Sequence, residues 1–351
     1  SVQINHKIDS VIGEGLKAGA FPGCVVFAAR KGKVIFHKAY GYQTYHGRSK
    51  VRKEDLYDLA SVTKISGSLS GLMLLEGMGS FSHMDQLGKY VPAMRGSDKA
   101  DLLLQDILAH RAGLYPWIPF WHQTVKRNGN FKRRLVSTYP SEKYSMVMAD
   151  HLYLRDKFRD KIYRTIRKSE LGEKEYRYSG LSFFLFPGII EELSGEAYEE
   201  FLYNNIYRRL GAWDLVYNPL RFYPLARIAP TEYDSLFRRQ QVHGYVHDES
   251  AATIGGFSGN AGLFATAGDL LKLIEMYRRM GSYGGEQIIP EAVLKEYTSY
   301  QFPENLNRRG LGFDKPLLGD SDGTQQDYPC PGASSSSFGH SGFTGTFVWA
   351  D

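Results

Sequence analysis

The residues best suited to chemistry are a serine and a lysine three positions apart, Ser61 and Lys64. On a helix, positions i and i+3 lie on the same face, so the hydroxyl and the amine can touch. A serine hydroxyl becomes a useful nucleophile only when a neighbouring base removes its proton. A lysine can be that base when burial or a positive neighbour lowers its pKa. The pair therefore predicts acyl transfer, with Ser61 as nucleophile and Lys64 as base.

By itself this pair is a weak signal, because a serine three residues before a lysine arises about once by chance in a chain of this length. An N-cap serine followed by a surface lysine would give the same pattern. Apolar neighbours favour burial of the pair, and the N-terminus of a helix favours negative charge developing near Ser61. These neighbours are Leu59, Ile65 and Leu69. Both interpretations stay open on this segment alone.

Two later segments carry groups suited to the same reaction. Tyr178-Ser179-Gly180 opens a helical run, and His340-Ser341-Gly342 begins a late strand-like segment. In this order the three segments resemble those of the serine β-lactamase and penicillin-binding-protein superfamily. The resemblance is greatest to the class C type and to its esterase and D-amino-peptidase relatives. Outside 115–176 it covers nearly the whole chain, and it is also carried by residues 108–114, 246–249, 255–256, 260–264 and 339–345.

The resemblance implies a role for each of these residues. Ser61 would form the acyl-enzyme after Lys64 takes its proton. Tyr178 would relay a proton to the leaving group or to the deacylating water. His340 stands where many members have a lysine, and a donor there can bind a substrate carboxylate and polarise Tyr178.

The resemblance also implies an oxyanion hole and no cofactor or metal. The backbone N–H groups of Ser61 and Phe343 would stabilise the charge that develops on the substrate oxygen, usually the largest contribution in acyl transfer. Ser341 and Gly342 would line the substrate side of the same loop.

Two departures from the family pattern bear on the substrate. Residue 180 is glycine where many members have an asparagine that positions substrate and lysine. His340 would be charged only in part near pH 7, unlike a lysine. Both favour ester or neutral-amide substrates over β-lactams. A literal Tyr-x-Asn pattern at Tyr203-Asn204-Asn205 lies inside a helical run and is interpreted as a coincidence.

Other polar groups are given structural interpretations. His110 is expected to hydrogen-bond locally rather than to touch substrate. His243, His247 and Asp248 have no obvious further ligand, so a metal site is not expected there. Residues 115–176 hold an aromatic cluster and a basic run, and these could wall a groove, act as a lid, contact an anionic glycan or lipid, or simply be solvated.

Several elements must position these residues. Helices are expected over 3–18, from Ser61 to Met78, and over 181–193, 198–210 and 267–280; a hairpin over 24–30 and 34–40; strand edges at 336–338 and 346–350; and a loop over 318–337. The predicted fold class is α/β (α+β), β-lactamase/transpeptidase-like: an antiparallel sheet flanked by helices with an inserted all-helical subdomain. We expect one catalytic domain over 1–351. Its sheet subdomain would comprise about 1–60 plus 267–351, and its helical subdomain about 61–266 with an insertion at 115–176.

Composition excludes some classes of function. The net charge of +5 over 351 residues does not indicate nucleic-acid binding. Two cysteines cannot form a disulfide framework, and no apolar run is long enough to span a membrane. No signal peptide is present, and the start at Ser1 without methionine favours a processed or excised piece. Because the family's sheet normally continues past the third segment, we expect the fold to be completed beyond Asp351 or by another segment.

The expected partner is a small-molecule or peptidoglycan-derived peptide substrate. Residues 308–316 resemble serine-hydrolase modules fused to glycoside hydrolase family 3 enzymes, which implies an upstream glycoside hydrolase domain. By resemblance the location is periplasmic or extracytoplasmic. The predicted function is hydrolysis of a D-alanyl peptide, an ester or a β-lactam through a Ser61 acyl-enzyme in cell-wall metabolism. The alternative is a non-catalytic penicillin-binding-like module that holds cell-wall fragments or a partner.

Overall fold

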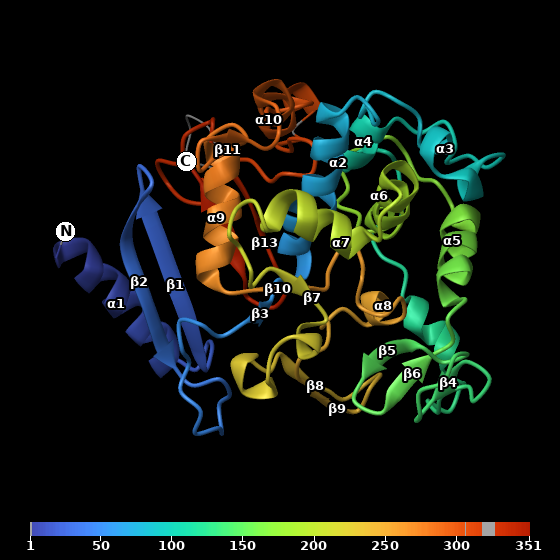
Figure 1. Cartoon of the computed structure of the whole chain (residues 1–351), viewed down its shortest axis with the longest axis horizontal. Coiled ribbons are helices and arrows are strands. Elements are labelled where there is room, and N and C mark those ends of the chain that lie inside the picture. Colours follow the sequence, from blue (N-terminus) through green and yellow to red (C-terminus); the bar gives the residue numbers. More distant parts are fainter. Residues whose placement is uncertain (1, 306, 318–326) are drawn as a thin grey trace.

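The computed structural model describes residues 2–305, 307–317 and 327–351. Figure 1 shows the N-terminal helix and hairpin on one side of the molecule, α5 and its neighbouring short strands on the opposite side, and α2 and α9 between them. Helix α1 (Val2–Lys17) packs beside the hairpin of β1 (Gly23–Arg30) and β2 (Lys33–Gly41). Both turn residues, Lys31 and Gly32, have positive φ, as a two-residue hairpin turn requires. The predicted helix and hairpin are confirmed.

Ser61, the predicted nucleophile, lies at the start of a helical segment that changes from a 3₁₀ to a π and then to an α conformation. A 3₁₀ turn (Ala60–Val62) is followed by a π-helical turn (Lys64–Ser68) and then by α2 (Leu69–Gly77). The predicted helix to Met78 is therefore present, although its first turns are not α-helical. Residues from Leu69 to Leu75 are buried on every side, as expected of a helix that is apolar all round.

Helices α6 and α7 cover one side of α2. Helix α6 (Phe186–Ser194) ends at Gly195, whose φ of 73° provides a left-handed C-cap. A side chain at Gly71 of α2 would lie 2.7 Å from Ile190 Cδ1, so the glycine permits the close approach of α6. Helix α7 (Tyr198–Leu202) continues into a second π turn (Tyr203–Tyr207), close to the prediction over 198–210.

Helix α9 (Ala267–Arg278) joins the two ends of the chain. It contacts β1 from the N-terminal hairpin and β14 (Phe347–Ala350), which pairs with β13 (Phe338–Ser341). Every paired strand among the described residues runs antiparallel to its neighbour, and the two hairpins form separate two-stranded sheets. The antiparallel strands flanked by helices confirm the predicted fold class.

The region between these ends is not all-helical, which corrects that part of the prediction. The insertion holds a three-stranded sheet in the order β4-β6-β5, followed by α5 (Phe158–Lys168). His151, with a φ of 52°, turns the chain between β5 and β6, so short apolar runs pair instead of coiling. The strands are β4 (Val136–Ser137), β5 (Met146–Ala149) and β6 (Leu152–Leu154), and a further pair is β8 (Glu232–Asp234) and β9 (Gln240–Val242).

A small sheet, β3-β10-β7, brings distant segments to the nucleophile. Asp58 of β3 pairs with Phe264 of β10, so the glycine-rich run before β10 lies beside residue 61. The remaining elements are β3 (Tyr57–Asp58), α3 (Leu87–Tyr90), α4 (Leu104–Leu108), β7 (Val216–Tyr217), α8 (Glu249–Ala252), β10 (Leu263–Ala265), β11 (Ser282–Tyr283), β12 (Glu286–Gln287) and α10 (Glu291–Thr298), with 3₁₀ turns at Pro92–Met94, Phe120–Thr124, Ser182–Phe184, Pro219–Arg221, Leu225–Arg227 and Pro303–Asn305.

Part of the loop predicted over 318–337 lies outside the described residues. Within 327–337 the chain forms no helix and only an isolated bridge between Tyr328 and Leu317. Across the described ranges, no helix combines the length and the apolar character needed to cross a bilayer. The division into a sheet subdomain and a helical subdomain stays a prediction.

Candidate active site

The structure brings the predicted nucleophile and base into direct contact. Lys64 Nζ donates a hydrogen bond of 2.9 Å to Ser61 Oγ and a second of 3.2 Å to the backbone carbonyl of Asn260. Lys64 is 2% exposed, whereas Ser61 is half-buried. No carboxylate in the described chain pairs with Lys64. A buried amine aimed at a more accessible hydroxyl is the geometry required to activate a serine.

The residue before the nucleophile has an unusual backbone conformation. Ala60 has a φ of 43°, in the left-handed region that residues with a side chain rarely adopt. Asp58 Oδ1 accepts the Ala60 N–H at 2.7 Å, and Asp58 Oδ2 accepts the His247 N–H at 2.6 Å. Burial raises the pKa of Asp58, and these two N–H donors oppose the shift. One buried carboxyl therefore supports the turn that presents Ser61.

Asn260 is the nearest neighbour of the position where many family members have an asparagine, residue 180. A side chain at Gly180 would meet only Asn260 Cβ, at 4.0 Å. The Asn260 backbone carbonyl contacts Lys64, and its side-chain oxygen accepts a hydrogen bond from Ser258. The missing side chain at 180 thus leaves open space beside the Ser61–Lys64 pair.

Tyr178 lies over this pair in a buried position. Its ring centroid is 5.3 Å from Lys64 Nζ and 4.5 Å from the centroid of the His110 ring. Its hydroxyl is buried and has no hydrogen-bond partner of good geometry among the described residues. Burial raises the pKa of Tyr178, but Lys64, the Ser61 hydroxyl and Arg309 together outweigh burial and hold it below its ordinary value. Such a phenol is suited to accept and return a proton near Ser61.

His340 does not carry the partial charge that the sequence analysis expected. Burial, Arg309 and Lys64 lower its pKa to about 3, so the imidazole is neutral near pH 7. Its Nδ1 lies 2.7 Å from the Ser341 carbonyl, which makes Nδ1–H the donor and leaves Nε2 an acceptor without a partner. The ring centroid is 6.1 Å from that of Tyr178. In this form Nε2 can only accept a hydrogen bond, and the role of His340 toward a substrate carboxylate stays a prediction.

Arg309 supplies the positive charge that His340 lacks, and the sequence analysis did not assign it to the site. Its guanidinium carbon lies 5.1 Å from the Tyr178 ring centroid, and the residue is 5% exposed. Nε donates to Tyr176 Oη at 3.2 Å, and Nη1 is buried without a partner among the described residues. The nearest carboxylate, Asp314, is 3.6 Å away and already bound by Arg308 at 2.8 and 3.2 Å.

Arg309 was hard to recognise because it lies far from the three segments in the chain. The backbones of Asp314 and Gly339 exchange two hydrogen bonds, which align residues 308–314 with β13. The only sequence feature that drew attention to Arg309 was the resemblance of residues 308–316 to serine-hydrolase modules fused to glycoside hydrolase family 3 enzymes.

The third segment closes against the nucleophile turn. A side chain at Gly342 would lie 2.5 Å from the Leu59 carbonyl oxygen, so only glycine fits there. Thr344 Oγ1 donates to the Asp58 carbonyl at 2.7 Å, and Thr346 Oγ1 donates to that of Leu59 at 2.9 Å. The loop that carries Phe343 is thereby fixed beside the turn that carries Ser61.

Several side chains of this region face solvent. The Phe343 ring is 84% exposed and lies 5.3 Å from the His247 ring, and Ser341 is also exposed. Within the described chain, the backbone N–H groups of Ser61 and Phe343 donate no hydrogen bond. Both donors are therefore available to a ligand.

The remaining polar candidates take structural roles. His110 Nδ1 accepts the N–H of Ser179 at 3.3 Å, and the ring of His110 packs against Tyr178. This partner is 69 positions along the chain, and the absence of a contact between His110 and substrate stays a prediction. His243 contacts the Ile228 carbonyl and His247 contacts Glu232, so the two histidines have separate partners.

No metal site or second tyrosine motif emerges from the other candidates. Across the described ranges, no three His, Cys, Asp or Glu side chains gather as a metal site would require. Asn204 and Asn205 both donate to Glu196 on the α7 side, consistent with a coincidental motif.

Comparisons with known proteins define the family. The Beta-lactamase family profile matches residues 8–351, and the chain belongs to this family. The chain is 27% identical to an Escherichia coli K12 protein whose name provisionally assigns a D-alanyl-D-alanine carboxypeptidase, covering 100% of this chain and 80% of that protein. It is 26% identical to the N-acetylmuramyl-L-alanine amidase of Bacillus subtilis strain 168, covering 99% of this chain and 78% of that protein.

A solved structure supports the same fold. The class C β-lactamase of Rhodobacter sphaeroides superposes with a TM-score of 0.63 at 16% identity, covering 97% of this chain and 88% of that one. The predicted family and fold class are confirmed, and the chain is a β-lactamase-family hydrolase by membership. The fused glycoside hydrolase domain stays a prediction.

Proposed function

We propose that this protein is a serine hydrolase that acts through a Ser61 acyl-enzyme on D-alanyl peptides of the cell wall. The observation that carries the proposal is the 2.9 Å hydrogen bond between buried Lys64 and Ser61, beneath a tyrosine whose pKa is lowered. Lys64 takes the Ser61 proton as Oγ bonds to the substrate carbonyl carbon. The backbone N–H groups of Ser61 and Phe343 receive the oxyanion.

Tyr178 then passes a proton to the leaving amine, and the carbon–nitrogen bond breaks to leave the acyl-enzyme. In the second half of the reaction, water attacks the ester and gives up a proton to Lys64 and Tyr178, the groups that moved protons in the first half. The Ser61 hydroxyl is thereby regenerated. Arg309, whose guanidinium carbon lies 5.1 Å from the Tyr178 ring centroid, brings positive charge to the site, which suits a substrate that ends in a carboxylate. The two relatives are named for cell-wall reactions, which supports an extracytoplasmic peptide substrate.

Acylation tests this proposal directly. Wild type, Ser61→Ala and an exposed-serine control, Ser10→Ala, are incubated with a fluorescent penicillin, a fluorophosphonate and a D-alanyl-D-alanine peptide. We expect one covalent adduct by intact mass and release of D-alanine from wild type and from the control. Ser61→Ala should give neither.

The penicillin arm also separates the rival functions. Rapid turnover of penicillin would indicate a β-lactamase, and faster labelling by the fluorophosphonate would favour ester substrates. A folded wild-type protein that forms no adduct and releases no D-alanine would favour the non-catalytic binding module instead.

A further inference from the structure

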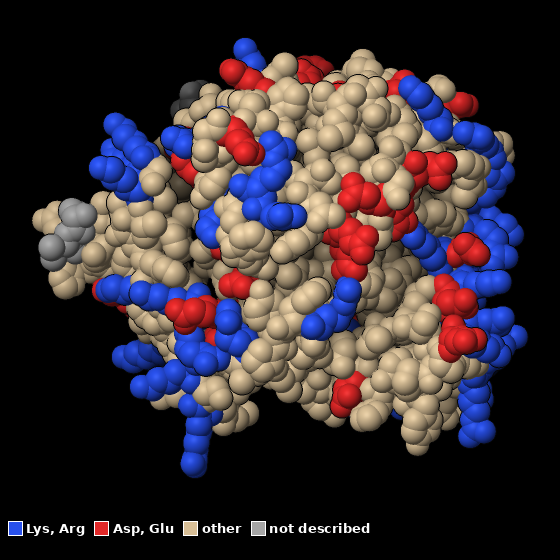
Figure 2. All heavy atoms as spheres, viewed as in Figure 1, with Lys and Arg blue, Asp and Glu red and all other residues tan. Residues whose placement is uncertain are grey.

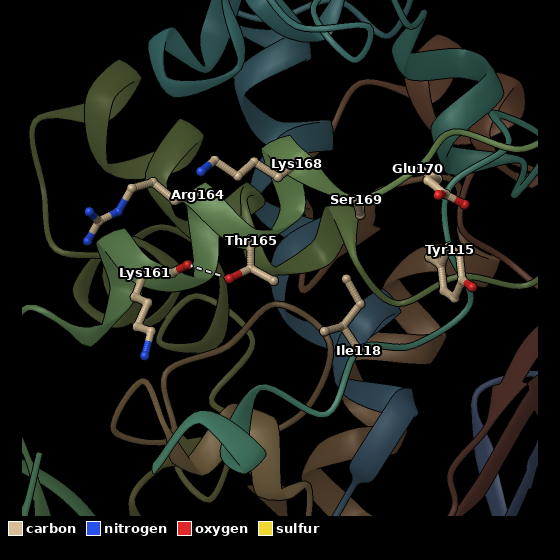
Figure 3. Close-up of a pocket in the computed structure, with 8 residues that line it drawn as sticks. All are labelled: Tyr115, Ile118, Lys161, Arg164, Thr165, Lys168, Ser169 and Glu170. Atoms are coloured by element: carbon tan, nitrogen blue, oxygen red, sulfur yellow. Dashed lines mark hydrogen bonds between the residues drawn. The ribbon is translucent and has the colours of Figure 1, made fainter. Parts of the chain in front are cut away.

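A cavity beside α5 is lined by residues other than the Ser61–Lys64 pair. It has a volume of about 680 Å³. Figure 3 shows three cationic side chains leaving α5, with Tyr115 and Glu170 at the other end of the group and Ile118 between. Its lining residues are Tyr115, Ile118, Lys161, Arg164, Thr165, Lys168, Ser169 and Glu170. The three cations and one carboxylate give this lining a net charge of plus two.

One face of α5 supplies the cations. Lys161, Arg164 and Lys168 are spaced at i, i+3 and i+7, which places them on one side of the helix. The opposite side is buried in the core by Phe158, Ile162 and Ile166. The helix is thus held by its apolar face while its basic face borders the cavity. Figure 2 shows Lys and Arg side chains gathered along the edge where Figure 1 places α5, with some acidic side chains beside them.

The charge on this face is not neutralised by the protein. Lys161, Arg164 and Lys168 form no ion pair within the part of the chain that the structure describes, whereas neighbouring Arg159 pairs with Glu191 at 2.9 Å. Like charges at these spacings oppose helix formation. An anionic ligand would relieve this repulsion.

Other basic groups strengthen the field at the cavity. Burial lowers the pKa of Lys161, and the nearby charges of Lys132, Arg134 and Arg164 lower it further. Lys132 and Arg134 come from the segment before β4, so two parts of the insertion contribute positive charge.

The cavity is connected to the catalytic segment through one loop. The Tyr115 side chain lines the cavity, while its backbone carbonyl accepts the Ser179 hydroxyl at 2.5 Å. The next carbonyl, that of Pro116, accepts the Gly180 N–H at 3.2 Å. Residues 115 and 116 are thus hydrogen-bonded to the two residues that follow Tyr178. A ligand in the cavity would contact the same loop that supports the catalytic tyrosine.

We propose that this cavity binds the acidic portion of a peptide substrate. The Arg164 guanidinium can hold a carboxylate through two hydrogen bonds, and the two lysines add point charges. Half-exposed Tyr115 and the partly buried Ile118 offer apolar contact to the peptide chain. Glu170 can accept a hydrogen bond from an N–H group or an amine. The substrate class rests on the proposed function, whereas the preference for acidic groups rests on the lining alone.

Binding is measured on Ser61→Ala protein, so that the result does not depend on turnover. The probes are dye-labelled Glu-Glu-Ala-D-Ala-D-Ala and Gln-Gln-Ala-D-Ala-D-Ala peptides, read by fluorescence anisotropy. Replacing Lys161, Arg164 and Lys168 together by glutamine should weaken binding of the acidic peptide roughly ten-fold and leave the neutral peptide little affected. The matched control replaces three exposed lysines at the N-terminal end, Lys7, Lys17 and Lys33, and should change either affinity less than about two-fold.

The outcomes separate this inference from the proposed function. Equal affinity of the two peptides, equal losses in both triple variants, or no loss in the α5 variant would each overturn the inference, even if Ser61 is acylated. Binding of a dye-labelled glycerol-phosphate oligomer that is lost in the α5 variant, with no binding of the acidic peptide, would overturn the inference and replace the peptide with a phosphate polymer. A selective loss in the α5 variant would support the inference even where no D-alanine is released. Thermal unfolding of both triple variants confirms that they are folded.

Discussion

At the scale of single residues, the site depends on a permanent cation beside a tyrosine. The Arg309 guanidinium faces the Tyr178 ring, while burial and nearby cations lower the pKa values of His340 and His110. If a charged histidine stood beside Tyr178 instead, activity would depend on pH through the titration of that histidine. The arrangement seen here removes that dependence, because the pKa of His340 is about 3.

Replacing Arg309 should alter the pH dependence of the reaction. The positive charge lowers the pKa of Tyr178, so Arg309→Gln should raise that pKa. The falling limb of kcat/KM, where Tyr178 loses the proton that it donates, should then move to higher pH. At pH 7 we expect kcat/KM to fall roughly ten-fold or more. Arg309→Lys keeps the charge and should keep most of the original profile. A ten-fold fall with an unmoved limb in Arg309→Gln would mean that the arginine only maintains packing.

At the scale of elements, the π turn sets where Lys64 points. A π turn inserts one extra residue into the helical winding and is common at functional sites. Here Lys64 opens the turn, and Gly67 within it lies against two buried tyrosines. A side chain at Gly67 would come within 2.6 Å of Tyr217 Oη and 2.9 Å of Tyr198 Oη.

Gly67→Ala should therefore destabilise the protein by about 1–3 kcal/mol and reduce acylation, because the turn must move away from the tyrosines. The control is Gly13→Ala in exposed α1, where a side chain would meet nothing within 4 Å. That change should stabilise by about 0.5–1 kcal/mol, since alanine favours helix more than glycine. Chemical denaturation measures the free energy of unfolding of both variants. A Gly67→Ala protein with the unfolding free energy of wild type would show that the tyrosine hydroxyls move aside without cost.

At the scale of the whole molecule, Asp58 joins segments that are far apart in sequence. Its carboxyl binds the N–H groups of Ala60 and His247, and its carbonyl accepts a hydrogen bond from Thr344. The nucleophile turn, the run at 247 and the third segment therefore meet at one buried residue that is 3% exposed.

Asp58→Asn should lower both stability and acylation. The amide offers one oxygen to two N–H donors, so one buried donor loses its partner, at a cost of about 1–3 kcal/mol. Asp101→Asn, at an exposed site, is the control and should change stability little. The measurement is denaturant unfolding together with the acylation rate. An Asp58→Asn protein with the unfolding midpoint of wild type would show that the carboxyl is not needed to hold these segments.

The sequence by itself determined the features that depend on local pattern. Apolar spacing predicted the N-terminal helix, the first hairpin and α9, because helix and strand periods are fixed by backbone geometry. The Ser61–Lys64 contact also followed from spacing, since three residues along a helical turn place both side chains on one face. The short strands of the insertion were missed, because runs of two to four residues carry too little periodicity.

Tertiary structure alone decided the electrostatics of the site. Arg309 lies beside Tyr178 in a segment that bridges β13 at Asp314 and Gly339, a contact between residues 25 positions apart that no local pattern records. The neutral state of His340 follows from burial and from two cations that converge on it from other segments. A pKa depends on solvent exclusion and on distances through space, and both exist only once the chain has folded.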